Sequence, residues 1–171
     1  MTSPRPRTLR LWSATGLCVA GLMLAGCSAT NPMTTEREYS ASDGVRVTLG
    51  DVRASNLLVI SSAKGAPGAV QGALTNDGEQ TRTVTLTAGD DSTTVTVEAG
   101  QTVLLTSDTS GGAPGDGRKD IVIPAVSVPP GAVLPVTIAT DAAGSEELGV
   151  PVLDGSQPEY ATLVPTPTPS A

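Results

Sequence analysis

Histidine is absent from this 171-residue sequence, and both cysteines fall within the first 27 residues. Transition-metal centres in proteins need converging His, Cys or Met ligands. Catalysis by Ser-His-Asp or Cys-His groups also depends on histidine. We therefore expect no cofactor, no metal site and no enzymatic activity.

Phenylalanine is absent too, and aromatic residues make up only 2% of the chain. A folded core must therefore be built from Val, Leu, Ile and Ala. With no cysteine after Cys27, no disulfide can staple the rest of the chain. The formal net charge of −7, from 10 Lys and Arg against 17 Asp and Glu, repels nucleic-acid phosphates. We expect no nucleic-acid partner.

No hydrophobic run is long enough to stay in a bilayer as a spanning helix. The apolar run 11–25 is shorter than the ~20 residues that such a helix needs, and polar residues interrupt it. Three arginines precede it within the first ten residues. This order of a basic segment and a short apolar segment is typical of a secretion signal that is removed after export.

The apolar run ends in Leu24, Ala25 and Gly26, and Cys27 follows. Small residues before a cysteine suit a lipoprotein signal peptidase, and these four residues resemble the bacterial lipobox. We therefore expect a mature lipoprotein that begins at Cys27 and carries acyl chains such as palmitate. Two or more chains would hold it firmly to the outer face of the cell membrane. The alternative is a plain secretion signal, cleaved near Ala25 or Ala29, with a free thiol at Cys27.

Composition divides the chain into four parts. After the signal peptide, 1–26, residues 27–43 are rich in Ser, Thr, Asn, Pro and Glu, which predicts a flexible spacer. Residues 44–154 have the composition of a folded domain. Residues 155–171 end in a Pro/Thr repeat and are expected to form a disordered tail.

Short runs rich in Val, Ile, Leu and Thr recur about every ten residues in the domain, with Gly, Asp, Asn or Pro between them. Apolar and polar residues alternate within these runs, as in Thr83–Thr87, and no stretch has a helical period. The expected strands are 45–49, 56–61, 70–75, 81–87, 93–98, 102–106, 120–123, 133–140 and 148–153. Pro124, Pro135 and Pro151 should lie at strand ends, edges or bulges, because proline has no N–H to donate. The pattern predicts an all-β fold, a single antiparallel β-sandwich of immunoglobulin-like or cupredoxin-like type.

Two weak motifs could carry chemistry. Ser61 and Lys64 have the S-x-x-K spacing of penicillin-recognising enzymes, which need these residues one helical turn apart. Here the motif follows a strand and runs into Gly-Ala-Pro-Gly at 65–68, which favours a chance match.

Calcium needs only oxygen ligands, which Asp90 and Asp91, or Asp108, Asp116 and Asp120, could supply. Neither group forms a compact loop of alternating ligands. Acidic residues in turns are usually solvated, so we expect no metal site.

Four segments carry a resemblance to a known family: 44–49, 57–60, 73–76 and 148–152. In this order, after a lipobox and an acidic spacer, they resemble the small actinobacterial lipoproteins of the LpqE type. An actinobacterial source also suits the abundance of Ala, Gly, Val, Thr and Asp. That group is similar to the periplasmic copper chaperones with a cupredoxin-like domain, so the resemblance implies this fold and an exported protein. The copper site of those chaperones uses paired Met and His, which have no counterpart here.

Together these features predict an extracytoplasmic, lipid-anchored protein with a non-catalytic β-sandwich that acts as an envelope binding or accessory module. Its partners would be the membrane, through the lipid, and an envelope protein or polymer. The loops 64–69 and 107–119 are the expected contact regions. The alternative is a lipoprotein of copper-chaperone ancestry that delivers a solute or a metal ion.

Overall fold

The computed structural model describes residues 42–107 and 117–166. Within these ranges the chain forms strands and no helix, so no helix there could cross a membrane. The all-β class is therefore confirmed. Leu24, Ala25, Gly26 and Cys27 lie outside the described residues, and the signal peptide and the lipidation of Cys27 stay predictions.

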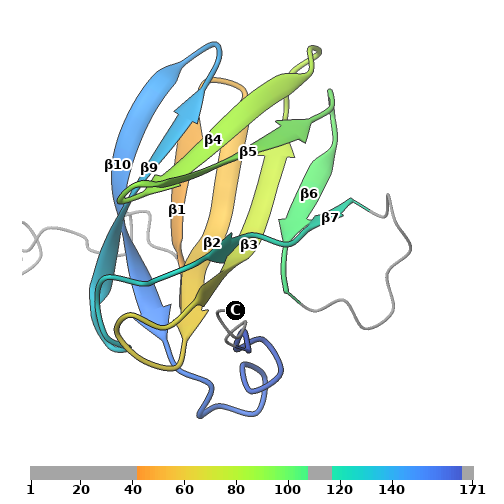
Figure 1. Ribbon diagram of the computed structural model, residues 1–171. Coiled ribbons are helices and arrows are strands. Elements are labelled where there is room, and N and C mark those ends of the chain that lie inside the picture. The colour runs from red at the N-terminus through yellow and green to blue at the C-terminus, as the bar shows by residue number, and fades with distance from the viewer. Residues whose placement is uncertain (1–41, 108–116, 167–171) are drawn as a thin grey trace, which may run out of the picture. The chain divides into compact units, whose positions relative to one another are not determined.

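Ten strands make up the domain. They are β1 (Val45–Leu49), β2 (Val52–Ser61), β3 (Gly68–Asn76), β4 (Arg82–Ala88), β5 (Asp91–Val97), β6 (Thr102–Leu105), β7 (Arg118–Lys119), β8 (Val122–Ile123), β9 (Val133–Thr140) and β10 (Gly144–Leu153). All ten belong to one sheet in the order β5-β4-β9-β10-β2-β3-β6-β7, with β1 beside β2 and β8 beside β3. The sheet curls until it is nearly closed and barrel-like, and its two ends, β5 and β7, come near each other (Figure 1).

The long strand β10 connects the two halves of this curled sheet. Its residues 144–151 pair with β9, whereas Val152 and Leu153 pair with β2. The pairing of β10 with β2 is parallel, and so is that of β6 with β7. The expectation of purely antiparallel strands is wrong for these two pairs, because β10 passes from one half of the sheet to the other and β7 follows a long connection.

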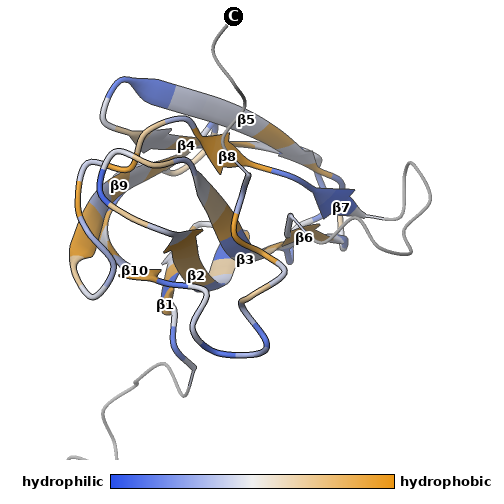
Figure 2. Cartoon of the chain, turned by 60° about the horizontal axis from the view of Figure 1, so that its bottom comes forward, coloured by the Kyte–Doolittle hydropathy of each residue, from blue (hydrophilic) through white to orange (hydrophobic). Residues whose placement is uncertain are grey.

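The core lies inside the curled sheet and is aliphatic. In β4, Val84 and Leu86 are buried while Thr83 is exposed, as the alternation predicts. Figure 2 shows apolar residues recurring along the strands and polar ones gathering at β7 and in the loops. The largest fully buried side chains of this core are those of Leu57, Leu74, Leu105 and Ile138, whereas Leu58 and Ile60 are buried outside this cluster. An inside filled by branched aliphatic residues explains how the domain packs without phenylalanine.

The strand prolines lie where a strand has a neighbour on one side only. Pro135 is paired with Gly149 of β10, but β4 contacts β9 only from Thr137 onward. Pro151 is paired with β9 just before β10 begins to pair with β2 at Val152. Because no strand pairs with the second side of Pro135 or Pro151, their missing N–H groups cost no hydrogen bond there, as expected for strand prolines.

Candidate functional site

The sheet does not close between its two end strands, and a groove of about 770 Å³ lies there. One wall is formed by residues 94–96 of β5. The other is formed by residues 102–103 of β6 and 117–119 at β7, and the β5–β6 turn contributes Glu98 and Gln101. Both walls come from the ends of the sheet, so the groove is the open seam of the barrel.

Each wall carries a strand edge with no strand beside it in the part of the chain that is described. β5 pairs with β4 along its whole length, from Asp91 to Val97, and its other edge has no partner strand. β7 pairs only with β6. Unpaired strand edges present backbone N–H and C=O groups that can bind another extended chain. The seam is therefore a place where such a chain could bind.

The side chains of the groove are polar and include two adjacent cations. Thr94 and Thr96 are exposed on β5, and Arg118 and Lys119 are exposed on the opposite wall. Glu98 is the single acidic residue of the lining. A cationic wall is unusual on a chain of net charge −7. The groove can thus offer hydroxyl groups, backbone groups and positive charge to a polar, extended ligand.

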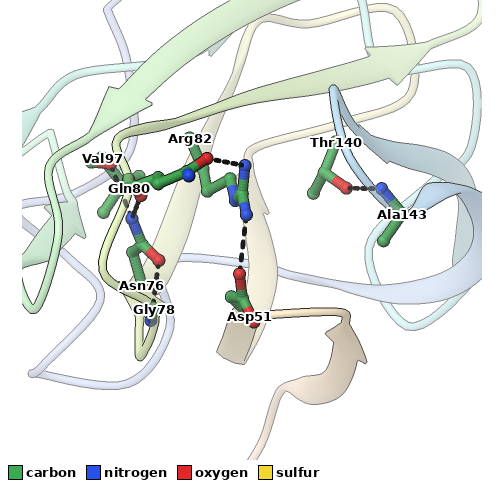
Figure 3. A network of polar contacts seen from close by, with 8 residues as sticks. All are labelled: Asp51, Asn76, Gly78, Gln80, Arg82, Val97, Thr140 and Ala143. Atoms are coloured by element: carbon green, nitrogen blue, oxygen red, sulfur yellow. Dashed lines mark hydrogen bonds and ion pairs between the residues drawn. The ribbon is translucent and has the colours of Figure 1, made fainter.

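A buried asparagine, Asn76, holds the β5–β6 turn at one end of the groove, and Figure 3 shows its side-chain hydrogen bonds. The Asn76 side chain is inaccessible to solvent, and its Nδ2 donates to the carbonyl oxygens of Gln80 (2.7 Å) and Val97 (3.1 Å). Its Oδ1 accepts a hydrogen bond from the Gly78 amide at 3.0 Å. The backbone N–H of Asn76 donates to the backbone carbonyl of Gln101 at 2.9 Å. Because Val97 ends β5 and Gln101 precedes β6, Asn76 fixes the turn between the two walls.

Ion pairs join the neighbouring loops at the same end of the barrel. Arg82 Nη2 lies 2.8 Å from Asp51 Oδ2, as Figure 3 shows, and Arg53 Nη1 lies 2.7 Å from Asp77 Oδ2. The Arg53–Asp77 pair is about half exposed, so we expect it to contribute no more than about 1 kcal/mol. Arg53 and Arg82 are therefore both in ion pairs. Lys119, in contrast, is in no ion pair with a described residue.

A second hollow, of about 350 Å³, lies where the C-terminal segment covers the outer face of β2, β3 and β6. Tyr160 and Leu163 line it opposite Leu58 and Leu104. The segment 155–166 was expected to belong to a disordered tail, but it forms turns here. The sequence did not predict this packing, because Tyr160 and Leu163 are isolated apolar residues that belong to no periodic pattern. The remaining residues of the predicted tail, 167–171, lie outside the described ranges.

Hydrogen bonds hold this C-terminal segment in place. Ser107 Oγ donates to the Leu163 carbonyl at 3.0 Å, and Gln71 Nε2 lies 3.3 Å from the same hydroxyl. The Tyr160 hydroxyl donates to Asp43 Oδ2 at 2.5 Å. The beginning and the end of the described domain are therefore joined. The pKa of Tyr160 is raised to about 12, mainly by the hydrogen bond to the Asp43 carboxylate and to a smaller extent by partial burial.

We expect Asp43→Asn to lower the pKa of Tyr160 from about 12 toward the ordinary tyrosine value of about 10. A pKa raised by folding stabilises the fold fully below pH 10, and this contribution is lost as the pH rises through 12. The measurement is a near-ultraviolet absorbance titration in a Tyr39→Phe background, which leaves Tyr160 as the only tyrosine. An unchanged titration of Tyr160 in Asp43→Asn would contradict the contact.

The S-x-x-K residues do not form a catalytic pair. Ser61 ends β2 and is fully buried, and its Oγ lies 3.0 Å from the Pro67 carbonyl and 3.2 Å from the Ala63 carbonyl. Lys64 is exposed in the loop that follows, and no helix joins the two residues. Ser61 therefore stabilises the β2–β3 loop.

Of the acidic residues considered for calcium, the structure describes Asp90, Asp91 and Asp120. Asp90 and Asp91 are exposed at the β4–β5 turn, and Asp120 is exposed after β7, while Asp108 and Asp116 lie outside the described residues. Over the described ranges, no three His, Cys, Asp or Glu residues lie together as a metal would require.

Of the two loops expected to contact a partner, only one contributes residues to the groove. The loop 64–69 packs against the segment after β8, where the Gly65 amide donates to the Val126 carbonyl at 2.7 Å. It contributes nothing to the groove. The loop 107–119 contributes its last three residues, 117–119. The β5 residues of the groove were not expected, because the Thr-rich alternation of β5 also occurs in the inner strand β4 and does not distinguish the two.

The sequence matches no family model and no curated protein. Among solved structures, the chain is similar to an apo PCuAC domain from PmoF1, with 13% identity and a TM-score of 0.48 over 64% of this chain and 98% of that one. It is also similar to a copper-bound PCuAC domain from PmoF2, with 11% identity and a TM-score of 0.46 over 64% of this chain and 97% of that one. The relationship to copper chaperones and membership of the LpqE-type group stay predictions. Likeness at this level says nothing about the ligand of the groove.

Proposed function

We propose that this chain is an exported lipoprotein, held on the outer face of the cell membrane by acyl chains on Cys27. Its domain, a cupredoxin-like sandwich in this proposal, acts as a non-catalytic binding or accessory module for an envelope protein or polymer. The basic and apolar segments before Cys27 support the address.

The observation that carries the binding role is the open seam of the barrel. Two strand edges that have no partner strand among the described residues face a polar groove of about 770 Å³, and a buried network around Asn76 fixes the turn at one end of it. Such a volume is within the ~300–1,000 Å³ usual for binding sites. A preorganised groove loses little conformational entropy on binding, which favours affinity.

Site-specific photo-crosslinking in cells tests this function. A photoreactive residue in place of Thr96, in the groove, should capture an envelope protein or polymer. The same residue in place of Thr48, exposed on β1 and outside the groove, serves as the matched control. Capture should require the tether and be lost in Cys27→Ala.

The readout is mass spectrometry of proteins and sugar analysis of the captured material. Equal capture from positions 48 and 96, or none from either, would contradict a binding role for the groove. A saturable shift on titration with copper or calcium would favour the alternative, delivery of a metal ion.

A further inference from the structure

We infer that the groove binds an extended, acidic polypeptide segment, which pairs as an additional strand with β5 and directs carboxylates toward Lys119. This inference rests on the proposed binding function and names the class of partner. It commits to a polypeptide rather than a polysaccharide, because the groove is bounded by backbone edges.

The backbone of β5 is the first reason. Its seven residues, Asp91–Val97, are paired with β4 on one side only. At about 3.4 Å per residue, this edge offers roughly 24 Å of alternating donors and acceptors. An extended peptide matches that spacing along its whole length, and strand addition is a common mode of peptide recognition. A sugar chain has no such repeat of amide donors.

The second reason is that β5 has little of the usual protection of an edge strand, since Asp91 at its beginning is its one charged residue. Edges in soluble proteins are commonly blocked by Lys, Pro or a bulge. β5 contains no Lys or Pro, and its register with β4 is continuous from Asp91 to Val97. Its threonines and valines also have high strand propensity. An exposed edge of this kind is suited to pair with another strand.

Charge selects the partner. Lys119 is exposed on the wall opposite β5, so carboxylates of a bound strand would lie near its positive charge. Opposite charges across an interface raise the association rate and disfavour partners of the wrong sign. Glu98, near the β5–β6 turn, would disfavour an acidic residue there.

A second copy of this chain is less suited to the groove than a separate acidic segment. Antiparallel pairing of two β5 edges, centred on Thr94, would place Asp90 of each copy opposite Glu98 of the other. Like charges directly opposite each other destabilise strand pairs. Lys119, on the far wall, would also gain no counter-charge from the paired β5.

The test uses a labelled synthetic heptapeptide with its two carboxylates in the middle, acetyl-Thr-Val-Glu-Val-Glu-Val-Thr-amide, and fluorescence anisotropy on the purified mature protein. The central position keeps both Glu residues away from Asp91 and Glu98 at the two ends of β5. A peptide with Lys in place of both Glu is the matched probe. We expect saturable binding of the acidic peptide and at least about tenfold weaker binding of the basic one. Lys119→Glu should reverse this preference. Lys64→Glu, which makes the same charge change on an exposed loop outside the groove, should leave it unchanged.

Backbone pairing is tested separately with two N-methylated versions of the acidic peptide, one methylated at odd amides and one at even amides. Alternate amides of a strand face opposite edges, so one version should lose binding and the other should keep it. Equal binding of both versions would overturn the inferred strand pairing, and so would equal binding of acidic and basic peptides. A protein that forms dimers at micromolar concentration and then fails to bind peptide would indicate a second copy as the occupant and would also overturn the inference.

Failure of this inference can be told apart from failure of the proposed function. If the photoreactive residue at position 96 captures a polysaccharide in cells while no peptide binds, the binding function stands and the inferred polypeptide partner is wrong. If that residue captures nothing and no peptide binds, both are wrong.

Discussion

Cys27→Ala is expected to abolish fatty-acid labelling of the protein and its lipid-dependent retention at the membrane. In the lipobox prediction, Cys27 is the residue that would carry the acyl chains. Each buried methylene contributes about 0.8 kcal/mol to membrane binding, so removal of all chains removes the anchor. The measurement is metabolic labelling with an alkyne fatty acid, followed by detergent phase separation of the cell extract.

Cys18→Ala is the matched control for this experiment, because Cys18 lies within the predicted signal peptide. It should keep full labelling and full membrane retention. If Cys27→Ala still carries the label, the lipobox prediction is wrong. A mature protein with a free thiol at position 27 would instead support the plain secretion signal.

Among the buried polar residues Ser61, Gln71, Asn76 and Thr140, we expect Asn76 to be the one whose replacement by alanine lowers the stability of the domain most. The substitution leaves the Val97 carbonyl and the Gly78 amide without their hydrogen-bond partner. A buried group left unpaired costs about 1–3 kcal/mol, and the exposed Gln80 carbonyl can turn to water. We expect the free energy of unfolding to fall by about 2–4 kcal/mol, with a fall in Tm on the order of 10 °C.

The matched control is Thr75→Ala, one residue earlier in β3. Its hydroxyl lies 2.9 Å from that of Thr102 in an exposed pair, so its loss should cost no more than about 0.5 kcal/mol. Chemical denaturation measures both variants. Hydrogen exchange should also become faster in Asn76→Ala at residues 97–101, next to the groove. Equal stability of the two variants would contradict the role of Asn76.

Alternation of apolar and polar residues predicted most of the strands. The bounds of β1 and β9 agree with the expectation, because every second residue there is buried. The beginning of β10 was missed, since Gly144, Ser145, Glu146 and Glu147 are polar and exposed and have no alternation to detect. β7 was missed because it consists of two charged residues that pair only with β6.

The candidate site was much harder to predict than the strands. Thr94 and Thr96 follow the same pattern as Thr83 and Thr85, yet β5 is an edge strand and β4 lies inside the sheet. The order of strands in the sheet decides which edge is free, and alternation carries no signal of that order. The contact of Tyr160 with Asp43 joins residues 117 positions apart and could not be read from either neighbourhood.

The sequence by itself determined the all-β class, the aliphatic core and the positions of most strands, because burial on one face of a strand requires a local alternation of residue types. It also determined the lack of histidine ligands and bases. Only the tertiary structure decided that the sheet curls, that β5 and β7 leave an open seam, and that Tyr160 and Leu163 cover β2. These features depend on pairings between distant segments, whose free energies come from strand order and shape rather than from any local pattern.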